Sequence, residues 1–446
     1  MLSKADNEFL TRSGKDTPMG ELLRRFWMPA LLSEELPERD GPPKKIRIMG
    51  EDLLAFRQTD GRVGIVEPHC PHRGANLYYG RNEECGLRCA YHGWKFDLDG
   101  NCVDLPTSPP ESGYKDTIKL LAYPTREWAD MIWVYMGPRD QMPELPQLEL
   151  GLVPAAHRYV SKKRQDCNWV QSLEGAIDTA HFSFLHAIPT KDEAVRVDLL
   201  RKTSAIGQEA SGLADRSRWI TDDPRPKFKI QGHDAGLVIA AGRKTDTTDL
   251  YWRIAQYLAP NHALVPVAFP GEVYHGQSWV PIDDITCWVY TYSWVPDRPL
   301  TNAERAKYAG GLSLHAEIDE HYVPRRNMGN DYLIDRELQK TLSFTGISGV
   351  SDQDAAIQDS QGAIQDRTRE HLGPTDAGIV EFRKLVMGAA RALQQGEPPR
   401  SAAASRRYAV RAGGWIATSE KDLVAIMNER FGHPDGYVGH EYGLAK

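Results

Sequence analysis

The chain has 446 residues and a formal net charge of −7 at pH 7, with 41% hydrophobic and 26% charged residues. These values are ordinary for globular domains, and the charge offers no basic surface for nucleic acid. No segment approaches the roughly 18 apolar residues of a membrane span, and residues 1–16 lack the apolar run of a secretory signal. Six cysteines are too few for a disulfide scaffold. The composition therefore predicts a cytoplasmic protein that binds neither nucleic acid nor a membrane.

Residues 26–146 are predicted to form a small all-β domain. Short apolar runs such as KIRIM, LLAFR, VGIVE and MIWVYMG are separated by turn-forming stretches such as TDGR and DLDGN. Short strands between such turns favour an antiparallel sandwich or barrel. The proline-rich stretch at 136–154 is predicted to lead out of this domain.

Two short Cys/His pairs lie in connecting loops of the all-β domain, Cys70-x-His72 and Cys89-x-x-His92. A structural zinc ion also accepts two thiolates and two imidazoles, but zinc fingers usually pair Cys with Cys and His with His. Mixed pairs favour a Rieske [2Fe–2S] cluster, in which one iron has two cysteine ligands and the other has two histidine ligands. A zinc site is the alternative interpretation.

Residues 166–186 are predicted to form a helix that carries ligands for a second metal. Asp178 and His181 are three residues apart and share a helix face. His181 and His186 point about 140° apart on an ideal helix, so they can bind one metal only where the helix ends or bulges between them. Pro189 favours such an end. Two imidazoles and one carboxylate would form the facial triad of non-haem Fe(II) oxygenases, whereas a pair of hydrogen-bonded helix-end histidines is the alternative.

The second part of the chain has strand patterns at 236–244, 249–260, 264–269 and 287–296, and helix patterns at 351–372 and 377–396. Strands followed by helices, without βαβ alternation, favour an α+β fold. We expect a second domain at 147–446, with residues 1–25 packing on it. The helix pattern at 351–372 carries candidate carboxylates for the metal, and spacing alone does not choose among Asp352, Asp354 and Asp359.

The motif segments resemble a known family. CPHRGANLYYG and CAYHGWKFDLDG are similar to the Rieske motifs of aromatic ring-hydroxylating oxygenases, and TPMGELLRRFWMPALL is most similar to the phthalate dioxygenase branch. The resemblance implies a large (alpha) subunit with a Rieske domain and a helix-grip catalytic domain, in which helices cover an antiparallel sheet. SDQDAAIQDSQGAI resembles the family segment that carries the carboxylate ligand, which selects Asp354.

The resemblance also implies the roles of individual residues. The cluster ligands would be Cys70, His72, Cys89 and His92, and the ligands of a mononuclear Fe(II) would be His181, His186 and Asp354. Asp178 would connect His181 to His92 of a neighbouring subunit, by fixing the imidazole tautomer and shortening the electronic path. This bridge implies a homotrimer or a hexamer made of two trimers.

The implied activity is that of a terminal oxygenase, which uses O2 to hydroxylate an aromatic compound. No G-x-G-x-x-G motif for a dinucleotide occurs in the chain. NADH is therefore expected to be oxidised by a separate flavin/iron–sulfur reductase that docks near the Rieske edge. Phthalate-type dioxygenation is the expected reaction; O-demethylation of a methoxylated aromatic acid and monooxygenation use the same ligands and are alternatives.

A carboxylated aromatic substrate would need a local cation, because bidentate guanidinium groups recognise carboxylates. Arg243, on a predicted strand, is the first candidate, ahead of Arg253 and Arg201. A strand-end arginine that keeps its charge in solvent is the alternative for Arg243.

Two further functions follow from other interpretations of the motifs. A Rieske electron carrier is disfavoured, because a carrier needs no second iron. A zinc hydrolase would need a general-base glutamate beside the histidines, and the nearest, Glu174, lies about two helical turns before His181.

Overall fold

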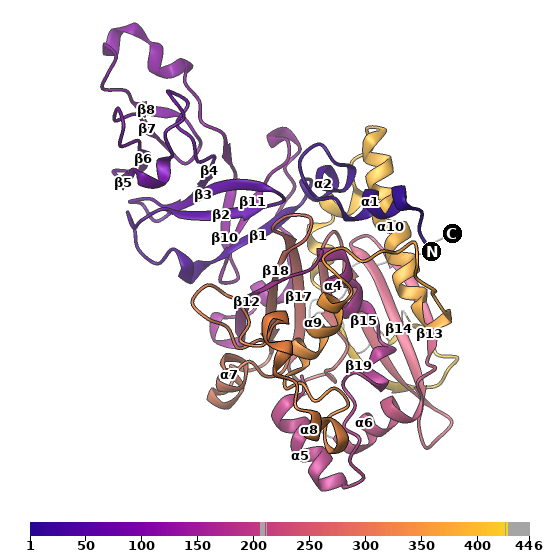
Figure 1. Ribbon diagram of the computed structural model, residues 1–446. Helices are drawn as coiled ribbons and strands as arrows, with labels where there is room; N and C mark the ends of the chain where they lie inside the picture. Colours follow the sequence, from indigo (N-terminus) through magenta and orange to yellow (C-terminus); the bar gives the residue numbers. More distant parts are fainter. Residues whose placement is uncertain (206–209, 211, 424, 427–446) are drawn as a thin grey trace. The chain divides into compact units, whose positions relative to one another are not determined.

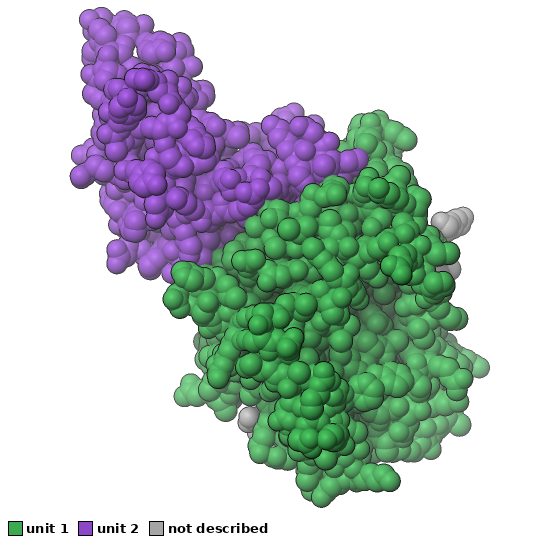
Figure 2. Space-filling view, in the orientation of Figure 1, with its two compact units in different colours: residues 1–12, 144–446 green, residues 13–143 purple. Residues whose placement is uncertain are grey.

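The computed structural model describes the chain except residues 206–209, 211, 424 and 427–446 (Figure 1). Two compact units are present, coloured separately in Figure 2: unit 2 is Ser13–Pro143, and unit 1 is Met1–Arg12 together with the chain from Glu144 onward. The sequence-based division lay at 146/147 and assigned residues 1–25 to the second part, whereas residues 13–25 cluster with unit 2. Within the described residues, no helix is long and apolar enough to cross a bilayer.

Unit 2 is built from short antiparallel strands after one helix. The elements are α2 (Pro18–Leu23), β1 (Trp27–Leu32), β2 (Lys44–Ile48), β3 (Glu51–Arg57), β4 (Val63–Val66), β5 (Arg81–Glu83), β6 (Gly86–Arg88), β7 (Lys95–Phe96), β8 (Cys102–Asp104), β9 (Ala122–Tyr123), β10 (Thr125–Trp128) and β11 (Met131–Tyr135). They form three sheets, ordered β1-β11-β10, β2-β3-β4-β9 and β5-β6-β7-β8. The predicted all-β character is confirmed.

Unit 1 contains an eight-stranded antiparallel sheet. Its strands are β12 (Arg158–Gln165), β13 (Lys227–His233), β14 (Gly236–Lys244), β15 (Leu250–Leu258), β16 (His262–Val265), β17 (Tyr274–Pro281), β18 (Cys287–Trp294) and β19 (Gly413–Ala417). The order is β12-β18-β17-β16-β15-β14-β13, and β19 pairs with β15. The expected strand at 264–269 is wrong beyond Val265, because the chain turns there before β17.

Helices cover this sheet (Figure 1). The helices of this unit are α1 (Lys4–Thr11), α3 (Glu149–Leu152), α4 (Trp169–Ile177), α5 (Glu193–Thr203), α6 (Leu213–Asp222), α7 (Asn302–Ala309), α8 (Arg336–Thr341), α9 (Val350–Ser360) and α10 (Ala377–Gln394), of which α3, α4, α6 and α10 contact strands of the sheet. Helix α4 packs on β15, β16 and β17 and contacts α9 and α10. The expected α+β fold, with an antiparallel sheet covered by helices, is confirmed.

The helix expected at 166–186 ends early, and this break positions the metal site. Helix α4 begins after the N-cap Asn168, whose side chain accepts from Val170 N–H, and ends at Ile177. Asp178 is extended, with φ −76° and ψ 117°. The chain resumes as a short 3₁₀ helix, η7 (His181–Ser183). The single-helix prediction is therefore wrong. The break that the five-residue spacing of the histidines requires lies between them, where η7 ends and Phe184 is non-helical, with φ −124° and ψ −67°.

Three buried histidines lie on or beside the sheet of unit 1, and burial disfavours their charged form. Desolvation lowers the pKa of His262 and of His275 to about 3, and the pKa of His315 well below its usual value. Ser293 Oγ lies 2.7 Å from His275 Nδ1 and 2.9 Å from His315 Nε2, and His275 Nε2 donates to the Ala205 carbonyl. The neutral rings of His275 and His315 are thus held in one hydrogen-bonded chain, and His262 Nδ1 lies 2.6 Å from Ser278 Oγ.

These histidines predict a loss of stability in mild acid. The folded chain keeps them neutral, whereas the unfolded chain protonates them below about pH 6.5, so stability falls as pH drops from about 6.5 toward 3. Each histidine contributes about 1.4 kcal/mol per pH unit, so the unfolding free energy at pH 5.5 should be about 4 kcal/mol below that at pH 7.5. Thermal unfolding midpoints across this range measure the effect. His321→Gln, at a side chain that is 78% exposed, should leave the profile unchanged, and a flat wild-type profile contradicts the prediction.

Candidate metal centres

The four residues of the Cys/His motifs occupy two loops of unit 2: Cys70 and His72 follow β4, and Cys89 and His92 connect β6 to β7. Both loops make the same turn. The backbone N–H of the glycine four residues after each cysteine donates to that cysteine's carbonyl oxygen, at 2.9 and 3.0 Å. Both glycines have positive φ, +74° and +76°, which disfavours any residue with a side chain there. The two loops therefore have the same backbone geometry, and each carries one cysteine and one histidine.

The side chains of these loops fit a two-iron cluster. The His72 and His92 rings are 4.5 Å apart, and His72 stacks on Trp94 at 4.4 Å. His92 Nδ1 is buried without a hydrogen-bond partner, which costs about 1–3 kcal/mol unless a ligand binds there. Burial raises the pKa of the Cys70 thiol to about 11, and a bound metal ion reverses this by stabilising the thiolate.

The second centre brings three side chains together in unit 1. His181 Nε2 and His186 Nε2 are 3.1 Å apart, and Asp354 Oδ1 lies 3.6 and 3.2 Å from them, respectively. Ligand atoms about 2.1 Å from one metal and at right angles to each other lie about 3 Å apart. Of the residues that the structure describes, only these three form a Cys, His or carboxylate group with ligand atoms all within 4.8 Å. The geometry can therefore hold one metal ion on one face.

Close packing of α4 on α9 brings the histidines to Asp354. A Cβ atom at Gly175 would collide with the side-chain nitrogen of Gln358, so glycine leaves room for this buried amide between the two helices. Asp354 is the one of the three candidate aspartates that meets the histidines. Asp352 faces Arg326, and burial raises its pKa to about 6; Asp359 accepts a hydrogen bond from Tyr332.

Each imidazole of the second centre is also held at its other nitrogen. Asp178 Oδ2 lies 3.3 Å from His181 Nδ1, and Gln353 Oε1 lies 2.7 Å from His186 Nδ1. Burial opposes both charges, but their interaction prevails, raising the pKa of His181 and lowering that of Asp178. The sequence interpretation assigned no role to Gln353; the signal was its place directly before Asp354.

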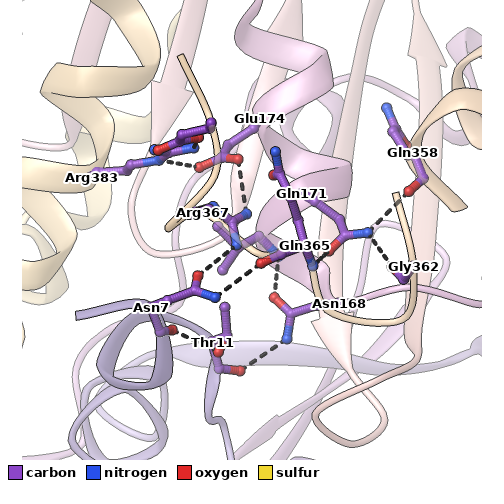
Figure 3. A network of polar contacts seen from close by, with 12 residues as sticks. Asn7, Thr11, Asn168, Gln171, Glu174, Gln358, Gly362, Gln365, Arg367 and Arg383 are labelled. Atoms are coloured by element: carbon purple, nitrogen blue, oxygen red, sulfur yellow. Dashed lines mark hydrogen bonds and ion pairs between the residues drawn. The ribbon is translucent and has the colours of Figure 1, made fainter. Parts of the chain in front are cut away.

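Glu174 belongs to a different network, drawn in Figure 3. Its carboxylate is ion-paired with Arg367 at 2.9 Å and with Arg383 at 2.6 Å, and Arg367 also donates to Asn7. Burial would raise the pKa of Glu174, but the two guanidinium groups lower it below its usual value. A carboxylate that is ion-paired with two guanidinium groups does not act as a general base. Glu174 therefore does not provide the general base that a zinc hydrolase would need.

A cavity of about 230 Å³ adjoins the second centre. His186, Phe182 and Gln353 line it on the metal side, and its other walls are largely apolar, with Ile188, Leu200, Ile220, Val265, Leu314 and Val350 among them. Among the described lining residues, Arg253 is the one arginine or lysine. Its guanidinium lies over the Phe182 ring, 4.0 Å from the centroid.

Arg243, the first candidate for substrate binding, does not line this cavity. It is fully buried and donates from Nη2 to the carbonyl of Thr179. Burial and the charge of Arg253 lower its pKa to about 9. The alternative interpretation, in which Arg243 is a strand-end residue that keeps its charge in solvent, is therefore wrong. The Arg243 side chain contacts the loop between α4 and η7. Arg201 does not line the cavity either.

Comparison with known proteins assigns both parts of the chain. Residues 26–124 match the model of the Rieske [2Fe-2S] domain, and residues 134–418 match the model described as "LigXa C-terminal domain like". The chain belongs to the Rieske oxygenases. This Rieske oxygenase is a non-haem iron enzyme whose cofactors are a [2Fe–2S] cluster and a mononuclear iron, which excludes zinc in the Cys/His loops and the carrier interpretation.

Relatives of this Rieske oxygenase include several with different named reactions. The phthalate 4,5-dioxygenase oxygenase subunit of Pseudomonas putida is 40% identical, covering 89% of this chain and 88% of its own. The 3-chlorobenzoate-3,4-dioxygenase oxygenase subunit of Comamonas testosteroni is 36% identical, over 95% and 98%. The 5,5'-dehydrodivanillate O-demethylase oxygenase subunit of Sphingobium sp. is 32% identical, over 90% and 83%.

A solved structure shares the fold at low identity. Dicamba monooxygenase bound to dicamba superposes with a TM-score of 0.55 and 17% identity, covering 84% of this chain and 99% of that one. The expected family, fold, enzyme class and cofactors are thus confirmed, and this chain is an aromatic ring-hydroxylating oxygenase component.

Proposed function

We propose that this oxygenase hydroxylates a small aromatic carboxylate by phthalate-type dioxygenation, with Arg253 holding the carboxylate beside the mononuclear iron. The observation that carries the proposal is the buried guanidinium of Arg253 in an apolar cavity next to His186. Relatives named for phthalate and 3-chlorobenzoate, both aromatic carboxylates, support the same substrate class. Arg253 replaces Arg243 as the first candidate, because Arg243 lies outside the cavity.

The state of the Arg253 side chain favours an anionic ligand. Its Nε and Nη2 nitrogens are buried and have no hydrogen-bond partner. A buried unpaired donor costs about 1–3 kcal/mol, and more when it is charged. A carboxylate can accept two parallel N–H bonds from one guanidinium and balance its charge at the same time. The apolar walls would then contact the aromatic ring.

We propose the same metal ligands that the resemblance to ring-hydroxylating oxygenases implied. The [2Fe–2S] ligands are Cys70, His72, Cys89 and His92, and the mononuclear iron ligands are His181, His186 and Asp354. When bound, the cluster would supply single electrons and the iron would activate O2. The chain's own part is to hold the ligand nitrogens with their lone pairs toward one point and to place the ring of the substrate next to them.

The electrons are proposed to come from NADH through a separate flavin/iron–sulfur reductase. The chain has no G-x-G-x-x-G motif, and its relatives are described as oxygenase subunits or components, which supports a separate reductase. We infer a homotrimer or hexamer in which Asp178 of one subunit connects His181 to His92 of the partner subunit. Asp178 Oδ1 accepts from Ala180 N–H and Oδ2 faces His181, and each oxygen has a second lone pair for such a bridge.

Asp178→Asn is expected to keep both metals and to slow turnover by about 10–100-fold, a usual cost of losing the outer partner of a metal ligand. The amide keeps the shape but loses the charge that raises the pKa of His181. Metal analysis and single-turnover reduction of the iron site measure the effect. Asp166→Asn, at a part-exposed carboxylate that pairs with Arg164, is the matched control. Normal turnover in Asp178→Asn rules out the bridge.

The substrate class can be tested with a panel of phthalate isomers, chlorobenzoates and methoxybenzoates, incubated with a reductase, NADH and O2. Mass spectrometry should detect a product that has gained two oxygens and two hydrogens. Release of formaldehyde from methoxybenzoates would instead establish O-demethylation by the same iron site. Conversion of the methyl esters as efficiently as of the free acids would contradict a role for Arg253 in binding a carboxylate.

A further inference from the structure

Gln353 contacts an imidazole of the second centre from the side opposite Asp354. Its Oε1 lies 2.7 Å from His186 Nδ1, while its Nε2 donates to the carbonyl oxygen of Ile347 at 2.8 Å. A carbonyl oxygen only accepts, so the NH2 group of the amide must face Ile347. The amide oxygen is then the atom that faces His186, and the orientation of the side chain is fixed by its second contact.

This orientation determines the tautomer of His186. The amide oxygen is an acceptor, so His186 Nδ1 must carry the proton. The lone pair of Nε2 is left to face Asp354 Oδ1, 3.2 Å away. Gln353 and Asp354 are consecutive on α9, about 100° apart around the helix, so one helix turn holds both nitrogens of the same ring.

The two imidazoles are held by unlike partners. His181 Nδ1 faces the carboxylate of Asp178, whereas His186 Nδ1 faces a neutral amide. A carboxylate raises the basicity of the imidazole it holds more than an amide does. The two histidines therefore offer the metal donors of different strength, although their Nε2 atoms converge on one point.

Resting on the iron site of the proposed function, we propose that Gln353 is a positioning residue that fixes the Nδ1–H tautomer of His186 for metal binding. Without its acceptor, the ring of His186 could place its proton on Nε2, which cannot then donate a lone pair to a metal. Outer partners of metal ligands are typically worth about 10–100-fold in metal affinity. The same loss is expected here.

The test uses the full chain with its Rieske cluster assembled and its mononuclear site emptied, titrated with Co(II) alone. Gln353→Met should weaken Co(II) binding by about 10-fold or more, with the visible spectrum of the cluster unchanged. Gln353→Glu keeps an acceptor at His186 Nδ1 but cannot donate to Ile347, and it should bind Co(II) no more weakly than wild type, because a carboxylate makes the imidazole a stronger donor than an amide does. Gln361→Met, at the exposed C-terminal end of the same helix, is the control for the substitution itself.

The outcomes separate this inference from its alternatives. Unchanged Co(II) affinity in Gln353→Met overturns it, and so does equal weakening in Gln353→Met and Gln353→Glu, because the contact with Ile347 would then be the important one. Gln353→Leu serves as the deletion variant where the methionine variant does not fold. A wild-type protein that binds no Co(II) at all would instead contradict the proposed iron site.

Discussion

Asp354→Asn should deplete the mononuclear iron and abolish oxygenation while leaving the Rieske cluster intact. Among the described residues, Asp354 is the one carboxylate whose oxygen lies within 3.6 Å of both His181 Nε2 and His186 Nε2. Loss of an outer partner of a metal ligand already costs about 10–100-fold in affinity, so loss of the anionic ligand itself should exceed about 100-fold. Iron and acid-labile sulfide per chain, with product formation, measure the result.

The neighbouring aspartates on α9 provide matched controls. Asp352 is buried and faces Arg326, away from the histidines, and Asp352→Asn keeps its shape. Asp359→Asn keeps an oxygen that can accept from Tyr332. Both variants should retain the mononuclear iron. Full iron content in Asp354→Asn, or its loss in Asp352→Asn, would assign the metal to a different carboxylate.

Arg253→Met should reduce kcat/KM for an aromatic carboxylate by about 30-fold or more, because truncating one partner of a buried charge pair costs about 2–5 kcal/mol. Methionine fills much of the same volume and keeps a contact with the Phe182 ring, so the cavity should keep its shape. The loss should fall on carboxylates alone: the methyl ester of the same acid should react no more slowly than with wild type. Steady-state kinetics on the acid and its ester measure both.

Arg243→Met tests whether Arg243 binds the substrate carboxylate or only holds the loop before His181 in place. Arg243 contacts the Thr179 carbonyl and does not line the cavity, so its loss should affect acid and ester equally, through the loop that precedes His181. A selective loss for the acid in Arg243→Met, with none in Arg253→Met, would reverse the assignment of the two arginines.

The Cys/His loops of unit 2, proposed to hold the cluster, were predictable from the sequence because the information that defines them is local. Each Cys/His pair lies within one tight turn, so the spacing of the motif and a positive-φ glycine describe the geometry almost completely. The strands that carry these loops follow from short apolar runs between turns. The order of the strands in three sheets follows from pairings between distant segments, which no single run of residues encodes.

The second centre was predictable only in part, because its ligands come from separate elements. The spacing of His181 and His186 required a break between them, and the structure places it at Phe184, where η7 ends. The choice of Asp354 over Asp352 and Asp359 came from family resemblance, since the helix period does not say which face meets α4. Gln353 acquires its role only through that same contact.

The sequence by itself determined the cofactor class, the all-β and α+β character of the two parts, and the histidines of the second centre, since these depend on residue type and short-range spacing. The tertiary structure decided which arginine reaches the cavity. Ala241 pairs with Arg253 and Arg243 pairs with Tyr251, so both arginines lie on the same face of β14 and β15. The alternation of side chains along a strand therefore does not distinguish the two arginines. Their contacts do: Arg243 donates to the Thr179 carbonyl in the α4–η7 loop, whereas Arg253 lies over the Phe182 ring.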